Sequence, residues 1–382
     1  MPSKKSKPRI IISVINNFEN DQRVQKVCHS LQKFGYEIEV ICSSLRAEPQ
    51  LDFPYKIHVL KLSAHQGMKM YLNYNWQLFW KLKKISRKND ILLANDLDAL
   101  LPNYLWHKWR KNALVYDSHE IFSEMPSLQN RTLKKKFWKT LESLIVPQLK
   151  HFYTVSHSYA NWFEEKYKVR PEVIRNVPIV KALVEEELTV QLPEINSSEK
   201  LIIYQGAVNY SRGIDKMIQS MTLIEQAQLW ILGDGPKRKE YERLTADLNL
   251  TDKVKFLGNL KPMQLKLVTP KADLGLSWEE DNGVSYRYAL PNKIFDYTHA
   301  GVPILGTNLP EIKHTIEEYG LGQVIESHEI AHLASKIKEM LAEGKEKYRL
   351  NLKNAAQVLN WDNEEQRLLK IYQSIRSNSR TA

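Results

Sequence analysis

Short apolar runs that alternate with helical patterns are the feature that most constrains how this chain folds. Residues 9–15 are apolar and rich in β-branched side chains, and a helical pattern follows through Arg23, Val27 and Leu31. A second short apolar run at 38–42 completes a strand–helix–strand unit. Strands separated by helices pair in parallel and are covered by helices on both faces, so this unit predicts a parallel sheet.

The same alternation continues and occurs twice along the 382 residues. In the first half, further strands are expected at 57–62, 91–94, 114–116 and 152–155, with helices near 72–88, 98–110 and 132–149. In the second half, strands are expected at 201–204, 229–232, 254–257, 274–277 and 303–305, again with helices between them. The chain is therefore predicted to be an α/β protein of two doubly wound domains.

The alternation of strand and helix patterns is interrupted once, and this interruption marks the expected boundary between the domains. Prolines, an acidic run and a polar stretch occupy residues 178–200, which we interpret as an interdomain linker. The first domain then covers residues 1–177, and the second covers 201–360. Residues 361–382 follow as a C-terminal segment, and its amphipathic helix could pack on either domain.

Net charge and cysteine content restrict the function classes. The chain has 55 Lys and Arg against 44 Asp and Glu, a formal net charge of +11, which indicates an anionic partner such as nucleic acid, anionic lipid or a phosphorylated small molecule. Its two cysteines, Cys28 and Cys42, are expected in the core and exclude a disulfide framework or a four-cysteine zinc site. Residues 1–9 lack a signal-peptide pattern, and no run approaches the roughly 20 apolar residues of a spanning helix, so a cytoplasmic location is expected.

Loops that follow strands of the second domain carry residues suited to phosphate. Ligands of open parallel sheets bind beyond the carboxyl ends of the strands. Gly206 follows one strand, Arg212 lies at the start of the next helix, and Gly233, Asp234 and Gly235 follow the next strand. Glycines permit close approach of a ligand to the backbone, and a guanidinium at a helix N-terminus favours phosphate oxygens. A G-x-G without a third glycine is also typical of a plain strand-to-helix turn, so both interpretations stand.

The segment 289–297 predicts a helix that opens at Pro291. Asn292 and Lys293 then lie in its first turn, and Asp296 lies one turn later. A lysine in a first turn opposes the helix dipole, a cost that is explained if an anion binds there. The alternative interpretation is a solvated pair between Lys293 and Asp296.

Acidic loops also follow two strands of the first domain. Asp117, His119 and Glu120 come after a short strand, so His119 is a candidate hydrogen-bond donor or proton carrier, although a histidine in such a loop is as often structural. Asp96 and Asp98 have a D-x-D spacing that can hold a divalent ion. No further carboxylate clusters near them in the sequence, so a strand-end turn and helix cap are favoured over a metal site.

Residues 71–88 and 133–149 are both basic and aromatic. The first segment places Trp76 and Trp80 among several lysines, and the second follows a run of three lysines. Either segment could lie on an anionic membrane surface. An ordinary amphipathic helix with its aromatic side chains in the core is the alternative, and the sequence leaves both open.

Taken together, these segments resemble the retaining glycosyltransferases of family 4, which have the GT-B fold. The most specific part is the run at 289–303, where Leu-Pro-Asn-Lys-Ile-Phe-Asp-Tyr is followed by Ala-Gly-Val-Pro, and the loops at 204–213, 232–236 and 116–120 support it. The resemblance covers nearly the whole chain, and it implies that residues 361–382 form a helix that crosses back to the first domain. It implies two Rossmann-like domains whose parallel sheets face a central cleft, with the acceptor in the first domain and a nucleotide diphosphate-sugar in the second.

The resemblance also implies roles for residues of the second domain. Asp296 stands where the family has a glutamate that binds the ribose hydroxyls, Arg212 pairs with the diphosphate, and Lys293 assists Arg212. The expected donor site comprises Gly206, Arg212, Gly233, Asp234, Gly235, Glu280, Asn292, Lys293 and Asp296.

This chain departs from the family pattern at two positions. Ala207 stands where a second arginine is common, and Tyr288 stands where the other glutamate of the family's pair would fall. Glu279, Glu280 or Asp281 could replace that glutamate, and Glu280 is taken as the candidate.

In the first domain, the resemblance implies an acceptor site near the first strand. Asn17 and Arg23 belong to the loop that members of the family place against the donor diphosphate and the acceptor. His119 matches a histidine expected to bind the transferred sugar. The expected acceptor and cleft residues are Asn17, Arg23, Asp117, His119 and Glu120, and the expected catalytic residues are His119, Arg212 and Lys293.

The expected activity is transfer of a sugar from a UDP- or GDP-sugar to a hydroxyl of a glycan or lipid-linked acceptor. Retention of configuration, independence of metal ions and of other cofactors, and a role in cell-surface polysaccharide or glycolipid synthesis are expected with it. Peripheral contact with the inner face of the cell membrane is compatible with the basic helices, and no nucleic-acid partner is expected. The alternatives are a nucleotide-sugar epimerase or phosphorylase on the same fold, and a non-enzymatic basic adaptor that binds membrane or nucleic acid.

Overall fold

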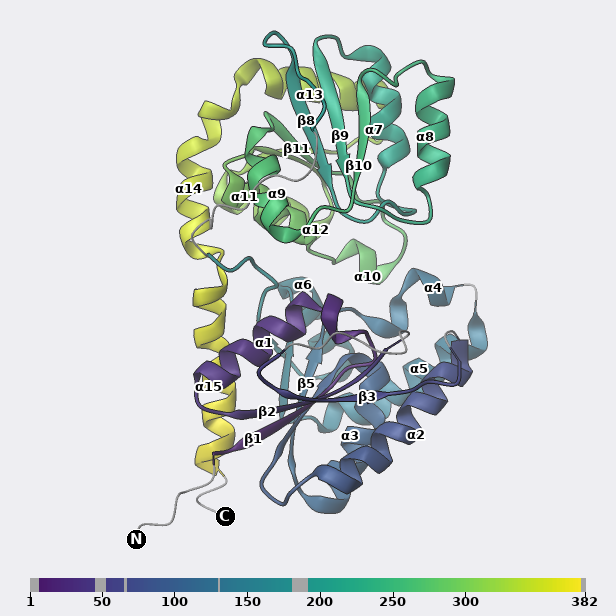
Figure 1. Ribbon diagram of the computed structural model, residues 1–382, viewed down its shortest axis with the longest axis vertical. Helices are drawn as coiled ribbons and strands as arrows, with labels where there is room; N and C mark the ends of the chain where they lie inside the picture. Colours follow the sequence, from purple (N-terminus) through teal and green to yellow (C-terminus); the bar gives the residue numbers. More distant parts are fainter. Residues whose placement is uncertain (1–6, 45–52, 65–66, 130, 181–191, 379–382) are drawn as a thin grey trace. The chain divides into compact units, whose positions relative to one another are not determined.

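The computed structural model describes residues 7–44, 53–64, 67–129, 131–180 and 192–378 (Figure 1). Within these ranges the chain divides into two compact units. Unit 1 contains residues up to 176 together with those from 364 onwards, and unit 2 contains 177–363. Much of the predicted linker, residues 181–191, lies outside the described residues, as do the first six residues and the last four.

Unit 1 is built on a parallel sheet of seven strands in the order β3-β2-β1-β4-β5-β6-β7. The strands are β1 (Arg9–Ser13), β2 (Glu37–Ser43), β3 (Lys56–Leu60), β4 (Ile91–Asn95), β5 (Ala113–Ser118), β6 (His151–Thr154) and β7 (Glu172–Val173). The central strands β1, β4 and β5 are almost continuously buried, as expected for a sheet covered on both faces.

Helices cover the sheet of unit 1. They are α1 (Gln22–Lys33), α2 (Gly67–Ile85), α3 (Asp96–Arg110), α4 (Pro126–Gln129), α5 (Thr132–Ile145), α6 (His157–Tyr167) and most of α15 (Trp361–Asn378), with 3-10 turns η1 (Phe18–Asn20), η2 (Phe122–Glu124) and η3 (Val146–Gln148). Helix α3 packs against both α2 and α5. Helix α15 is tied to α1 by Glu365, which accepts a hydrogen bond of 2.8 Å from Ser30. Cys28 of α1 and Cys42 of β2 are buried, which confirms their predicted place in the core.

Unit 2 repeats the architecture with a parallel sheet of six strands in the order β10-β9-β8-β11-β12-β13. Its strands are β8 (Lys200–Gln205), β9 (Ala227–Leu232), β10 (Val254–Gly258), β11 (Leu274–Ser277), β12 (Ile304–Thr307) and β13 (Gly322–Ile325). The two parallel sheets confirm the predicted α/β fold. Strands β7 and β13 were not predicted, because each is a short, partly exposed edge strand without a continuous apolar run.

Helices also surround the sheet of unit 2. They are α7 (Ile214–Ser220), α8 (Arg238–Asp247), α9 (Pro262–Val268), α10 (Val284–Arg287), α11 (Asn292–Ala300), α12 (Pro310–Tyr319), α13 (Ile330–Glu343) and α14 (Arg349–Val358), with 3-10 turns η4 (Met221–Leu223), η5 (Thr269–Lys271) and η6 (Lys345–Tyr348). Across both units, none of the helices in the described ranges is long and apolar enough to span a bilayer.

Strand order locates the place in each unit where a ligand is expected. The order reverses between β1 and β4 in unit 1 and between β8 and β11 in unit 2, and open α/β sheets bind ligands at such switch points. Two residues other than glycine adopt positive φ in the loops at these points, Asp96 after β4 with φ of 58° and Ser211 after β8 with φ of 62°. Such strained backbone persists where the surrounding structure enforces it, so both loops are held in one shape.

Candidate functional site

In unit 2, two cations share one buried carboxylate at the switch point of the sheet. Glu279 follows β11, and its Oε1 accepts a hydrogen bond of 2.6 Å from Nζ of Lys293 in the first turn of α11. Arg212, in the loop after β8, places Nη1 3.6 Å from the same oxygen. The second carboxylate oxygen accepts a bond of 2.7 Å from Ser277. Residues from three separate segments therefore converge on Glu279.

The charges of this cluster do not cancel. Burial by itself raises the pKa of the Glu279 carboxyl, but the neighbouring cations Lys293 and Arg212 outweigh it, so the pKa lies below its ordinary value and Glu279 stays ionised at neutral pH. One negative charge thus faces two positive charges. Arg212 keeps 26% of its side chain exposed whereas Lys293 keeps only 7%, so the uncompensated positive charge is accessible mainly on Arg212. Such a cluster can bind an anion.

Aromatic rings lie beside both cations. Nζ of Lys293 is 4.2 Å from the ring centre of Tyr204, and the Arg212 guanidinium is 5.1 Å from that of Tyr286. The Tyr204 hydroxyl donates a hydrogen bond of 2.9 Å to the carbonyl of Ala207, which anchors the loop after β8. These contacts hold the two cations by cation–π attraction as well as by charge.

The glycines of this region are required by backbone packing. A Cβ on Gly233 would lie 1.8 Å from the carbonyl oxygen of Gly206, and a Cβ on Gly235 would lie 2.3 Å from that of Val208. Both Gly206 and Gly233 also adopt positive φ. The Gly-x-Gly at 233–235 is therefore explained by the contact between the loops after β8 and β9, and a ligand is not needed to account for it.

Gly213, the residue between Arg212 and helix α7, gives a testable case of this packing. It has φ of +60°, and an added Cβ would lie 2.0 Å from Cδ1 of the buried Trp278. Gly301 has a similar φ of +69° but open space around it, so Gly301→Ala is a matched control that carries only the backbone strain. We expect Gly213→Ala to lower the free energy of unfolding by about 2 kcal/mol more than Gly301→Ala, because overpacking adds to strain. Urea unfolding of both variants measures the difference, and equal losses would contradict the packing argument.

Other predicted donor-site residues lie around this cluster with different partners. Asp296 of α11 accepts a hydrogen bond of 2.8 Å from the side chain of Gln205, at the end of β8. Asn292 begins α11 and is exposed. Asp234 is exposed, and its carboxylate accepts a bond from the backbone N–H of Gly235.

The side-chain partners bear on two expectations for this region. Glu280, the candidate to replace the family glutamate, has its carboxylate 2.9 Å from Lys216, whereas the adjacent Glu279 joins Lys293 and Arg212. A donor contact by Glu280 therefore stays a prediction. The solvated pair of Lys293 and Asp296 is not what the structure contains, because Lys293 is buried against Glu279.

In unit 1, a second charged network lies at the ends of β4 and β5. Arg23 of α1 forms two hydrogen bonds with the Asp117 carboxylate, of 2.9 and 3.2 Å, and a third of 3.1 Å with the carbonyl of Ile174. His119 follows β5 and places Nε2 3.0 Å from Asp117 and Nδ1 3.3 Å from Asp96. The Asp96 carboxylate also accepts a bond of 2.8 Å from the backbone N–H of His119. The histidine is thus held between two carboxylates.

The protonation states of this network follow from its geometry. Burial alone raises the pKa of Asp117, but the charges of Arg23 and His119 outweigh it and lower the pKa to about 2. Burial alone lowers the pKa of His119, but Asp117 and Asp96 outweigh it and raise the pKa to about 10. His119 is therefore an imidazolium at neutral pH, with both ring nitrogens as donors. In this state it can donate a hydrogen bond but cannot accept a proton.

The remaining predicted residues of unit 1 do not share one position. Asn17 caps η1, where its side chain accepts a bond of 3.3 Å from the backbone N–H of Glu19. Glu120 is exposed beside His119. Arg23 is buried, and its guanidinium donates to Asp117 and to the carbonyl of Ile174. It therefore fixes the carboxylate that contacts His119 and does not present these donors to a ligand.

Asp96 belongs to the charged network of unit 1, and sequence reasoning did not place it there. It was interpreted as part of a strand-end turn and cap, which fits its place at the first turn of α3, but its carboxylate also contacts His119. The contact follows from the strand register, in which Asn95 of β4 pairs with Asp117 of β5, and the sequence alone does not give that register. Asp98, the other member of the D-x-D triplet, is buried, and no group of three or more potential metal ligands occurs among the described residues.

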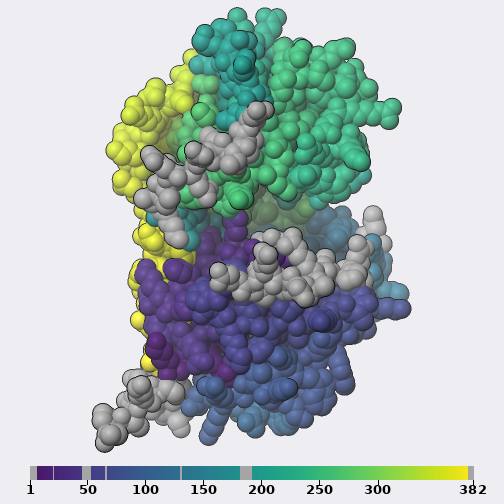
Figure 2. Space-filling model, in the orientation of Figure 1, coloured from purple at the N-terminus to yellow at the C-terminus, as the bar shows by residue number. Residues whose placement is uncertain are grey.

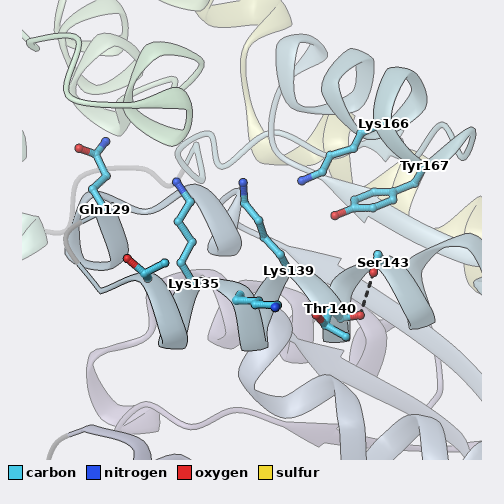
Figure 3. Close-up of a pocket in the computed structure, with 9 residues that line it drawn as sticks. Gln129, Lys135, Lys139, Thr140, Ser143, Lys166 and Tyr167 are labelled. Atoms are coloured by element: carbon cyan, nitrogen blue, oxygen red, sulfur yellow. Dashed lines mark hydrogen bonds between the residues drawn. The ribbon is translucent and has the colours of Figure 1, made fainter.

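A hollow in unit 1 lies apart from these residues. It has a volume of about 490 Å³ and lies between α5 and α6 (Figure 3). Its wall contains Gln129, Thr132, Lys135, Lys136, Lys139, Thr140, Ser143, Lys166 and Tyr167. Glu124 pairs with two of its lysines, at 2.8 Å from Lys135 and 2.7 Å from Lys139, so much of their charge is already compensated. None of the predicted site residues lines this hollow.

Comparison with known families assigns each half of the chain. Residues 186–358 match the family described as "Glycosyl transferases group 1", and residues 22–178 match "Glycosyltransferase Family 4". The first match contains Arg212, Glu279 and Lys293, and the second contains Asp117 and His119.

Individual relatives are similar over part or all of the chain. A stretch of 194 residues is 25% identical to N-acetyl-alpha-D-glucosaminyl L-malate synthase of Bacillus anthracis, covering 49% of each chain. The chain spans at most about half the length of the curated relatives it matches. Among solved structures, sucrose-phosphate synthase from Thermosynechococcus elongatus is 15% identical with a TM-score of 0.78, covering 97% of this chain and 100% of that one. HepE of Anabaena in complex with UDP is 14% identical with a TM-score of 0.70, covering 96% and 100%. These structural likenesses establish the fold.

Proposed function

The chain belongs to the group 1 glycosyltransferases of family 4, with the GT-B fold, and we propose that it transfers a sugar from a nucleotide diphosphate-sugar to a hydroxyl acceptor. The observation that carries the proposal is the cluster in which Arg212 and Lys293 share the single carboxylate of Glu279. Its net positive charge lies at the switch point of the sheet in unit 2, where open α/β sheets bind their ligands. A diphosphate is an anion suited to that position.

The same cluster can promote departure of the diphosphate. As the bond between the sugar and the phosphate breaks, negative charge builds up on the leaving diphosphate while the sugar acquires oxocarbenium character. A guanidinium and an ammonium held in place before the reaction stabilise that developing charge more than they stabilise the bound substrate. We propose that Arg212 contacts the diphosphate directly, and that Lys293, held by Glu279, contributes its charge from the first turn of α11.

The donor nucleotide is proposed to lie along the loops that surround this cluster. Asp296 would bind the ribose hydroxyls, and Gly206 would allow the diphosphate to approach the backbone after β8. Asn292, at the exposed start of α11, and Asp234, after β9, are further donor contacts in this proposal. The Anabaena relative was solved with UDP, which favours a UDP-sugar over a GDP-sugar as donor.

The acceptor is proposed to bind unit 1 near His119. As an imidazolium between Asp96 and Asp117, His119 has one ring N–H near each carboxylate, and its Nε2 is buried against Asp117. We propose that Nδ1–H, which lies 3.3 Å from the partly exposed Asp96, is the donor shared with a sugar hydroxyl. With a pKa of about 10, His119 is already protonated at neutral pH and cannot take the acceptor proton, so we propose that this proton passes to the departing phosphate in a same-face, retaining reaction that uses no metal ion. We propose that the acceptor is a glycan or a lipid-linked sugar of cell-surface polysaccharide or glycolipid synthesis. In support, a protein of Rhizobium meliloti that is 34% identical to this chain over 58 residues is a glycosyltransferase of lipopolysaccharide core biosynthesis.

Thermal denaturation with nucleotides tests the donor proposal. We expect UDP or GDP at 100 times its dissociation constant to add about 2.7 kcal/mol of stability, which corresponds to a rise in Tm of about 5 °C or more, because the ligand binds only the folded protein. ADP and CMP serve as comparison ligands, and each measurement is repeated with a chelator. The rise should persist with the chelator and shrink in Arg212→Ala. No rise with any nucleotide diphosphate would contradict the proposal and favour a non-enzymatic adaptor.

A further inference from the structure

Helix α2 exposes an apolar stripe on the side opposite its buried face. Leu72, Trp76 and Trp80 recur every four residues and are 59%, 66% and 44% exposed. The buried residues Tyr74, Leu78 and Leu82 have the same spacing but are offset by two positions. Two positions correspond to about 200° around a helix, so the exposed stripe points away from the core. The tryptophans therefore do not serve the packing of α2 against the sheet.

The stripe continues onto the neighbouring helix α3. Leu105 and Trp109 are 48% and 59% exposed and are also four residues apart. Lys83 of α2 connects the two helices, because its Nζ lies 4.6 Å from the ring centre of Trp80 and 5.8 Å from that of Trp109. The exposed surface of α2 and α3, which we call the tryptophan face, comprises Leu72, Trp76, Trp80, Leu105 and Trp109. Exposed tryptophans grouped in this way mark an interaction surface.

The tryptophan face is surrounded by positive charge. No acidic residue occurs from 67 to 89, whereas Lys69, Lys81, Lys83, Lys84, Arg87 and Lys88 lie in that stretch. The last turn of α3 adds Lys108 and Arg110. The next acidic residue, Asp90, is buried and hydrogen-bonded to Arg9, so it does not offset this charge at the surface. The partner must therefore be apolar and anionic at once.

A bilayer that contains anionic phospholipid has both properties. Tryptophan rings settle at the level of the headgroups, leucine side chains enter the upper acyl region, and lysines extend to the lipid phosphates. Leu72 and Leu105 argue against nucleic acid as the partner, because leucine offers no ring on which a base can stack. We propose that the tryptophan face of α2 and α3 docks this protein on an anionic phospholipid membrane. Docking does not depend on the proposed sugar transfer and can be measured without a donor.

Vesicle co-sedimentation tests the proposal with two sets of variants of the full chain. The apolar variant carries Trp76→Ser, Trp80→Ser and Trp109→Ser, and the charge variant carries Lys83→Glu, Lys84→Glu and Lys108→Glu. Matched controls in unit 2 replace exposed apolar and basic residues, Leu223→Ser with Leu350→Ser, and Lys239→Glu with Lys338→Glu. Vesicles of phosphatidylcholine alone are compared with vesicles that contain roughly 40% phosphatidylglycerol, at low and at high salt. Because every substituted side chain is exposed, thermal melting should show all variants folded.

The wild-type protein should partition about tenfold or more in favour of the phosphatidylglycerol vesicles, and salt should weaken this binding. Both variants should lose about tenfold of that binding, while the controls stay within about twofold. Brominated lipids should quench tryptophan fluorescence of the wild type more than that of the apolar variant, which reports direct contact. Equal binding to both vesicle types, or unchanged binding by both variants, would overturn the proposal. A concentration-dependent dimer that the apolar variant abolishes, or RNA binding tighter than vesicle binding, would overturn it in favour of a second copy or nucleic acid.

Discussion

Replacement of Arg212 by alanine is expected to lower kcat/KM for the donor by about tenfold or more, at about 1.4 kcal/mol per decade. Arg212 is the more exposed of the two cations that share Glu279, so its charge is the one that a diphosphate can reach. Lys293→Ala is expected to cause a loss of the same size. Steady-state kinetics with the nucleotide-sugar identified by thermal denaturation measures both effects.

Stability separates the two variants. Arg212→Ala leaves Glu279 paired with Lys293, so the free energy of unfolding should change by about 1 kcal/mol or less. Lys293→Ala leaves Glu279 buried with only the more distant Arg212, and breaking a buried pair costs about 3–5 kcal/mol. Arg243→Ala, on the exposed surface of α8, is the control and should alter neither quantity. Near-normal kcat/KM in both variants would contradict the assignment of the phosphate site.

Arg23→Met is expected to cause the largest loss of stability in unit 1. The methionine keeps the apolar volume of the side chain but removes both hydrogen bonds to the fully buried Asp117. A buried charge that loses its partner costs about 3–5 kcal/mol. Arg170→Met is the matched control, because Arg170 pairs with Glu164 on the surface and an exposed pair contributes about 1 kcal/mol or less. Urea unfolding at pH 6 measures both losses, and a loss below about 1 kcal/mol for Arg23→Met would contradict the role of this pair.

The pH dependence of this loss follows from the shifted pKa values. The folded-state pKa of Asp117, about 2, is below its ordinary value of 3.8. The contribution of Asp117 to the free energy of unfolding is therefore fully present above pH 3.8 and is lost as the pH falls through 2. The folded-state pKa of His119, about 10, is above its ordinary value of 6.5, so its contribution is present below pH 6.5 and is lost as the pH rises through 10. Arg23→Met reduces the contribution of the ionised Asp117 to stability, because the charge of Arg23 helps to lower the pKa of Asp117. The difference between wild type and variant should therefore shrink between pH 4 and pH 2, and a constant difference would contradict this account.

The fold could be predicted from the sequence to a large extent. Strands such as β1, β4 and β8 are buried from both faces, so each one appears as a short run of apolar residues between polar loops. Strand boundaries were displaced by one or two residues at β3, β6 and β12, where the apolar run and the hydrogen-bonded ladder do not coincide. The short edge strands were missed because partial exposure removes the apolar signal.

The candidate site could be predicted only in part. Arg212 and His119 were predicted near the ends of strands and Lys293 in the first turn of a helix, and the structure places all three there. The partners of these residues were not predictable in the same way. Glu279 and Glu280 are neighbours in sequence with the same chemistry, and only the direction of each side chain decides that Glu279 meets Lys293.

The basic aromatic helices α2 and α5 were also predicted only in part from the sequence. The sequence indicated that α2 combines tryptophans with lysines, but it left open whether those rings face the core or the solvent. The structure places Tyr74 and Leu78 inward, so Trp76 and Trp80 point outward. On α5 the outcome is split, because Trp138 is buried and Phe137 is exposed.

The sequence by itself thus determined the two parallel sheets, the loops that carry polar residues, and the excess of positive charge, because these depend on the order and kind of neighbouring residues. Only the tertiary structure decided that Glu279 joins two cations, that Asp96 and Asp117 hold His119 as an imidazolium, and that Arg23 is buried behind them. These contacts join residues that lie far apart in the chain. Their pairing depends on strand register and on the direction of each side chain, and a linear pattern specifies neither.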